Sequence, residues 1–83
     1  MATLESLAEG WESFQRAALA DPQIGTVQRW EMRRAFYAGA YFVFTTVERI
    51  ADPDVTEGEG VDRLSGFKVE LEQFYRDLKA GRA

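Results

Sequence analysis

The sequence predicts an all-α protein in which a short N-terminal helix packs on an antiparallel two-helix hairpin that self-associates into a helical oligomer. Apolar residues recur at helical spacing in three separate segments, and turn signals rich in Asp, Pro and Gly separate these segments. The chain has 83 residues and no cysteine or histidine, so disulfides and Cys or His zinc sites cannot support its small core. Association with another copy remains, and we expect one helical domain over residues 1–83.

The first helix is predicted over residues 3–19, in the stretch TLESLAEGWESFQRAAL. Thr3 can cap its start, and the turn signals of ADPQIG end it. Its apolar face consists of Leu4, Leu7, Ala8, Trp11, Phe14 and Ala18.

The second helix, predicted over residues 26–50, has two apolar faces. One is an ordinary core stripe within an arc of about 120°, made of Met32, Ala35, Phe36, Gly39, Val43, Thr46, Val47 and Ile50. The other lies about 150° around the helix and consists of Trp30, Tyr37, Tyr41 and Phe44, flanked by Arg33 and Arg34. The first helix, another subunit or a ligand has to cover this aromatic face.

An acidic loop is predicted over residues 52–59, and a third helix over residues 60–80. The loop lacks the order of acids, the Gly and the closing Glu of an EF-hand, so we expect a solvated connector without a metal. The helix carries a seam with 3-4-3-4 spacing, suited to packing along another helix, and its AGRA end is predicted to fray. The seam consists of Leu64, Phe67, Leu71, Phe74 and Leu78.

Charge and hydropathy exclude several function classes. A net charge of −4 argues against general nucleic-acid binding, because phosphate contacts need a basic surface. The start, MATLESLAEGWE, is acidic where a signal peptide is basic. The longest apolar run has about 13 residues, whereas roughly 20 are needed to span a bilayer. We therefore expect a soluble cytoplasmic protein that does not bind membranes.

Catalysis is not expected, and we predict no catalytic residue, no cofactor and no metal. Without His or Cys, acid–base chemistry would depend on carboxylates, Lys or Tyr, and the carboxylates lie on predicted outer faces. The stretch EGEG lacks the sequence context of a phosphate-binding loop.

Arginines and aromatic residues at helical spacing form the candidate ligand site. Guanidinium groups bind phosphates and rings stack on bases, so such a strip can hold a nucleotide. The same residue types are enriched in protein–protein interfaces, and packing against the first helix is a third possibility. The ligand-binding candidates are Trp30, Arg33, Arg34, Tyr37 and Tyr41, with Lys68, Tyr75 and Lys79 as secondary candidates. The predicted oligomer interface consists of Tyr41, Phe44, Phe67, Leu71 and Phe74.

Two resemblances bear on function. The segment QRWEMRRAFYAGA, with the acidic first helix and the AGRA end, resembles small uncharacterised helical proteins of tailed phages. A Glu-hydrophobic-Arg-x-Ala-Phe pattern also resembles phage sponge proteins that block CBASS immunity by sequestering cyclic nucleotides. It is matched by Glu31, Met32, Arg33, Ala35 and Phe36. Those sponges are short helical chains that form oligomers. This sequence lacks their histidines and the dense LEEA pattern of their last helix, so no binding residue is transferred.

These observations favour a phage counter-defence protein in the cytoplasm of an infected bacterial host. We expect it to sequester a nucleotide immune signal, such as a cyclic nucleotide or an ADP-ribose derivative, at a subunit boundary and without catalysis. One alternative is a phage protein that binds and inhibits a host or defence protein. Another is a small virion or assembly component.

Overall fold

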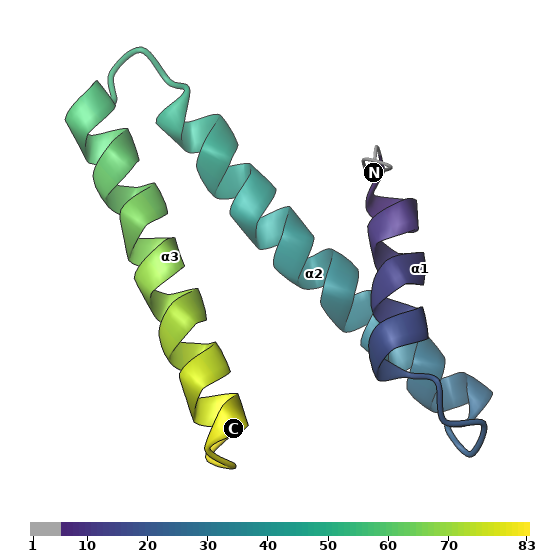
Figure 1. Cartoon of the computed structure of the whole chain (residues 1–83). Helices are drawn as coiled ribbons and strands as arrows, with labels where there is room; N and C mark the ends of the chain where they lie inside the picture. The colour runs from purple at the N-terminus through teal and green to yellow at the C-terminus, as the bar shows by residue number, and fades with distance from the viewer. Residues whose placement is uncertain (1–5) are drawn as a thin grey trace, which may run out of the picture. The chain divides into compact units, whose positions relative to one another are not determined.

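The computed structural model describes residues 6–83, which form three α-helices and no strand (Figure 1). Helix α1 spans Leu7–Ala18, α2 spans Thr26–Ile50 and α3 spans Glu57–Lys79. The all-α prediction is confirmed, and α2 has the predicted bounds. The chain up to Phe44 forms one compact unit, and the end of α2 with α3 forms a second. Each unit is described separately below, and the single domain predicted for the whole chain stays a prediction.

Helix α1 begins after Ser6. The Ser6 hydroxyl accepts a hydrogen bond from the backbone N–H of Glu9 at 3.1 Å, which satisfies one of the unpaired donors of the first turn. The predicted cap, Thr3, and the first predicted residue of the apolar face, Leu4, lie outside the described residues.

Both connectors contain the same Asp-Pro turn. In each, the Asp carboxylate accepts from the backbone N–H two residues later at 2.8 Å. The Asp carbonyl oxygen accepts from the N–H three residues later, at 3.2 Å for Asp21 and 3.0 Å for Asp52. The next helix begins five residues after each Asp. Ala-Asp-Pro is therefore a short repeat that sets the starts of both long helices.

Helix α3 begins at Glu57, three residues earlier than predicted. Thr56 and Glu59 form a capping box: the Thr56 hydroxyl accepts from the Glu59 N–H at 3.1 Å, and the Glu59 carboxylate accepts from the Thr56 N–H at 3.3 Å. Acidic side chains in the first turn also suit the positive end of the helix dipole. The last residues of the predicted acidic loop are helical for these two reasons.

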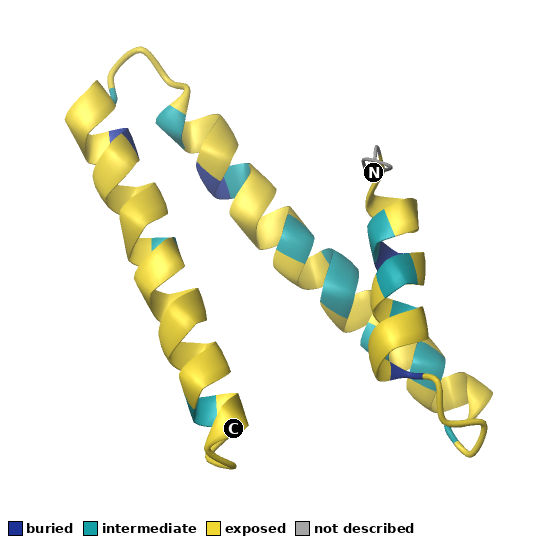
Figure 2. Cartoon of the chain, viewed as in Figure 1, coloured by how far each residue is buried: buried dark blue, intermediate teal, exposed yellow. Residues whose placement is uncertain are grey.

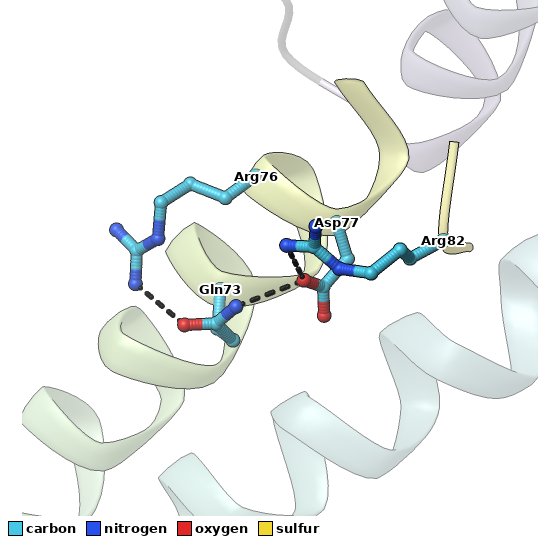
Figure 3. Close-up of polar contacts among 4 residues, drawn as sticks. All are labelled: Gln73, Arg76, Asp77 and Arg82. Atoms are coloured by element: carbon cyan, nitrogen blue, oxygen red, sulfur yellow. Dashed lines mark hydrogen bonds and ion pairs between the residues drawn. The ribbon is translucent and has the colours of Figure 1, made fainter. Parts of the chain in front are cut away.

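The C-terminal end of α3 is capped, and the AGRA end lies beyond the helix, so the prediction that it frays stays a prediction. Gly81 has a φ of 76°, which favours glycine, and its N–H donates to the Leu78 carbonyl oxygen at 3.1 Å. The Arg82 N–H donates to the Asp77 carbonyl oxygen at 2.7 Å, which completes a Schellman motif. The Arg82 side chain also pairs with the Asp77 carboxylate at 2.9 Å, and Gln73 donates to the same oxygen at 2.9 Å (Figure 3).

Three aromatic rings hold α1 on the first part of α2. The ring centres of Trp11 and Phe36 are 5.7 Å apart, and Phe14 lies 5.8 Å from Trp11 and 6.1 Å from Phe36. Trp11 and Leu19 are the buried hydrophobic residues of the described chain, with 7% and 4% of their surface exposed. These ring contacts place Trp11 and Phe14 of the predicted apolar face against α2, although Phe14 is 42% exposed.

In the second unit, α3 approaches the end of α2 closely at Gly60. A Cβ added at Gly60 would lie 2.5 Å from Cγ2 of Ile50, which is closer than real atoms approach. Thr46, one turn before Ile50, is buried as well. The absence of a side chain at position 60 therefore allows this contact.

Much of the predicted core surface is exposed. In the predicted stripe of α2, Met32, Phe36 and Ile50 are half-buried and Thr46 is buried, whereas Ala35, Gly39, Val43 and Val47 are exposed. In the seam of α3 only Phe67 is half-buried, and Figure 2 shows exposed residues along most of that helix. Helical spacing identified the apolar rows, but each unit covers only part of them.

We expect Gly60→Ala to lower the free energy of unfolding by up to about 2 kcal/mol. Overpacking against Ile50 costs about 1–3 kcal/mol, and a gain of about 1 kcal/mol in helix propensity offsets part of this cost. Gly66→Ala is the matched control in the same helix, because nothing lies within 4 Å of its Cβ position. It should raise stability by up to about 1 kcal/mol. Denaturant unfolding followed by circular dichroism measures both, and an equal rise for the two variants would contradict the close contact.

Candidate functional site

Tyr37 is held in place by the aromatic cluster of the first unit. Its ring meets the Phe36 ring edge to face, with centres 5.6 Å apart and an interplanar angle of 76°. Phe36 is fixed in turn by Trp11 on α1. Tyr37 is half-buried, so its ring presents one side to solvent in a defined orientation.

Arg33 lies over the ring of Tyr37. The guanidinium carbon is 5.0 Å from the ring centre, within the range of a cation–π interaction. The two residues are four positions apart on α2, so they belong to the same side of the helix. The N–H donors of a guanidinium lie in the plane of the group, where an anion can accept their hydrogen bonds. The pair therefore offers a charged group with a preset position.

A hollow of about 430 Å³ adjoins this pair. Its size falls within the range of small-molecule sites, roughly 300–1,000 Å³. The small side chains of Ala38 and Ala40 leave the space, and aromatic rings form much of its wall. The lining residues are Leu7, Tyr37, Ala38, Ala40, Tyr41 and Phe44.

The structure brings together part of the predicted ligand set. Arg33 contacts Tyr37, and Tyr37 and Tyr41 share the hollow. Trp30 is 59% exposed and Arg34 is exposed, and neither lines the hollow. Tyr41 is 73% exposed, so the aromatic face of α2 is open to solvent over much of its length. Among the described residues of α1, Leu7 meets this face at the hollow.

The secondary ligand candidates lie apart from this hollow, on α3. All three are exposed, and Tyr75 meets Phe74 edge to face at 5.8 Å. The predicted interface residues are exposed except Phe67, which is half-buried. The exposed ones are Tyr41, Phe44, Leu71 and Phe74.

A second hollow, of about 450 Å³, lies between α1 and α2 and was not predicted from the sequence. Arg16 and Arg29 line it from different helices, and Arg29 donates to the Asp21 carbonyl oxygen at 3.2 Å. Packing of the helices brings these residues together from distant sequence positions. The available signal was Arg29 itself, a charged residue that helical spacing places beside the core stripe of α2. The hollow is lined by Glu12, Gln15, Arg16, Leu19, Ala20 and Arg29.

Residues 6–83 contain no group of carboxylates arranged to hold a metal ion. In the same part of the chain, no helix is long and apolar enough to cross a bilayer.

No family model, curated protein or solved structure matches this chain.

A double-mutant cycle should detect the contact between Arg33 and Tyr37. We expect Arg33→Ala and Tyr37→Leu to be coupled by about 0.5–1 kcal/mol in the free energy of unfolding, the usual size of an exposed cation–π contact. The control cycle pairs Arg34→Ala with Tyr37→Leu, because Arg34 makes no ring contact in the structure. Thermal and denaturant unfolding supply the energies, and equal coupling in both cycles would show that Arg33 has no special position.

Proposed function

We propose that the chain is a phage counter-defence protein that sequesters a nucleotide immune signal without catalysis, in a site at a subunit boundary. The observation that carries the proposal is the cation–π contact of Arg33 with Tyr37 beside an aromatic-walled hollow. It combines a fixed cation with ring surfaces, the two features that bind the phosphate and the base of a nucleotide.

The proposed pose follows from the sides of α2. Arg33 and Arg34 are about 100° apart on the helix and flank the aromatic face. A phosphate accepts hydrogen bonds from these guanidinium groups, and a base stacks on Trp30, Tyr37 or Tyr41. Because the chain is acidic overall, the attraction for an anion is local to this cluster. A cyclic nucleotide or an ADP-ribose derivative has the required combination of groups.

Self-association is part of the proposal, and so is the antiparallel packing of α2 and α3. The support is the exposed apolar surface: large hydrophobic side chains are exposed along both long helices. Contiguous apolar surface is rarely left in water by a monomeric soluble protein. A site that uses Tyr41 would then lie next to a second subunit.

The second candidate function is binding and inhibition of a host or defence protein, or a role as a small virion or assembly component. The observation that favours it is the α3 seam, where Leu64, Leu71, Phe74 and Leu78 are all about half exposed. Such a row can dock along a helix of another protein. This candidate predicts that the chain binds a partner protein and has no affinity for nucleotides.

Calorimetric titration with cyclic di- and trinucleotides and ADP-ribose derivatives tests the first candidate. We expect the wild type to bind at least one of them at micromolar affinity or tighter. Arg33→Ala should weaken this binding about tenfold or more, because a charge-assisted hydrogen bond contributes roughly 1.5–3 kcal/mol. Lys at position 33 should restore only part of the affinity, since the planar fork is lost.

The matched control for this titration is Arg63→Ala, which removes an exposed arginine of α3 and should leave affinity unchanged. If the wild type binds no compound of the panel, the protein-inhibitor candidate replaces the nucleotide one. If it binds and Arg33→Ala binds equally well, the site lies elsewhere, and Lys68, Tyr75 and Lys79 are the next residues to substitute.

Light scattering tests self-association. We expect the wild type to be a dimer or larger, and Tyr41→Glu with Phe44→Glu to dissociate it, because two charges would enter the apolar contact. Val69→Glu is the control, since Val69 is 62% exposed but lies outside the seam of α3. A wild-type mass of 9.4 kDa would show a monomer and contradict the proposal.

A further inference from the structure

The charges on the exposed side of α2 lie in two pairs, one toward each end of the helix, and in each pair the negative residue comes first. Near the N-terminal end a negative residue, Glu31, precedes a positive one, Arg34. Near the C-terminal end a negative residue, Glu48, precedes a positive one, Arg49. All four are exposed, and none makes an ion pair within residues 6–83. When a second copy of the helix is laid antiparallel on the first, Glu31 faces Arg49 and Arg34 faces Glu48, so each negative charge meets a positive one.

The two remaining charged residues of α2 have contacts inside the first unit. Arg29 donates to the Asp21 carbonyl oxygen at 3.2 Å, and Arg33 lies over Tyr37 at 5.0 Å. The two pairs therefore contain every α2 charge that lacks such a contact.

Between the charges, the same side of α2 is apolar and has a small side chain beside a large one. A row with alternating spacing of three and four residues follows the helix, as in antiparallel helix pairs. Tyr41 in this row is 73% exposed, Phe42 beside it is 62% exposed, and Ala38 one turn earlier leaves space. The row consists of Val27, Glu31, Arg34, Ala38, Tyr41, Thr45 and Glu48.

We infer that two copies of this chain pair through α2, antiparallel, about a two-fold axis that passes near Ala40. This inference rests on the self-association proposed above and names its arrangement. In this pairing Tyr41 packs on Ala38 of the partner subunit. Arg34 meets Glu48 of the partner subunit, and Glu31 meets Arg49 of the partner subunit. Two-fold symmetry repeats each contact at the other end of the helix pair.

The charges select the antiparallel direction. A parallel pair in register would place each of these residues beside its own copy, so that like charges meet at four positions. Like-charge contacts disfavour an arrangement more than exposed ion pairs favour one, so their main effect is on specificity. Opposed helix dipoles favour the antiparallel pair as well.

The pairing also completes the candidate ligand site. Ala38 and Tyr41 line the hollow and lie at the centre of the paired surface, so the partner subunit closes one side of the hollow. The pairing narrows the ligand proposal above, because Arg34 then contacts the partner subunit and Arg33 is the arginine that faces the ligand. The nucleotide site and the dimer contact therefore share one side of α2 and use different arginines.

Charge reversal with rescue tests the pairing. Arg34→Glu and Glu48→Arg should each raise the dissociation constant of the dimer about tenfold or more, because each puts like charges together at both ends. The double variant should restore the wild-type constant within about threefold, since the pair is rebuilt with reversed signs. Arg63→Glu on α3 is the control for a change in net charge. Sedimentation analysis at moderate salt gives the constants, and a double variant weaker than both single variants would overturn the inference.

Distances between spin labels test the direction independently. The chain has no cysteine, so Val27→Cys and Ala38→Cys each give one label per subunit. Antiparallel pairing near Ala40 separates the two Val27 positions by roughly 40 Å along the helix axis, at 1.5 Å per residue. The two Ala38 positions should lie within about 15 Å of each other. Labels at Val27 only about 10 Å apart would show parallel helices and overturn the inference.

Failure of this arrangement and failure of the ligand proposal give different results. An oligomer with the wrong label distances contradicts the α2 pairing and leaves nucleotide binding to be judged by calorimetry. A monomer contradicts both the pairing and the self-association on which it rests.

Discussion

The packing of Trp11 on Phe36 is the contact on which the rest of the first unit depends. It fixes α1 against α2. Through the edge-to-face contact of Phe36 with Tyr37, it also fixes the orientation of the Tyr37 ring, which Arg33 contacts. The contact of Trp11 with Phe36 thus holds the two helices together and also supports the Tyr37 ring of the candidate site. Loss of the tryptophan ring would release α1 and leave Tyr37 without its support, although Trp11 lies outside the hollow.

Local signals in the sequence predicted the helices well and their ends less well. The bounds of α2 were predicted correctly from the turn residues on both sides of it. The start of α3 was predicted too late, because the glycines on either side of Glu59 indicated a loop and the capping box of Thr56 and Glu59 was not recognised. The contact of Arg33 with Tyr37 could be predicted from the sequence, because residues four positions apart are neighbours on a helix. The position of Arg29 in the second hollow could not, because it depends on how α1 packs on α2. Periodicity also identifies apolar rows without saying which of them a neighbouring helix covers, and the exposed Val43 shows this limit.

The surface of α2 combines two kinds of information. Its aromatic residues supply contact area but do not select the relative direction of two paired helices, because apolar burial is not directional. Its charges supply direction at little gain in affinity, because exposed ion pairs contribute only about 0–1 kcal/mol each. A chain with so little buried apolar surface would otherwise associate in many ways. The order of signs along one helix is an economical means of selecting a single arrangement.

The Asp-Pro turns have a consequence for the speed at which the functional form appears. Each turn is closed by hydrogen bonds that span two or three residues. The helix contacts on either side of the turns join nearby parts of the chain, since Trp11 contacts Phe36 about 25 residues later and Ile50 approaches Gly60 about 10 residues later. Proteins dominated by local contacts fold within microseconds to milliseconds. In the proposed dimer, the encounter of two folded chains is the slower event, and its rate rises with concentration. The level of synthesis would then set how soon after translation the proposed dimer is present.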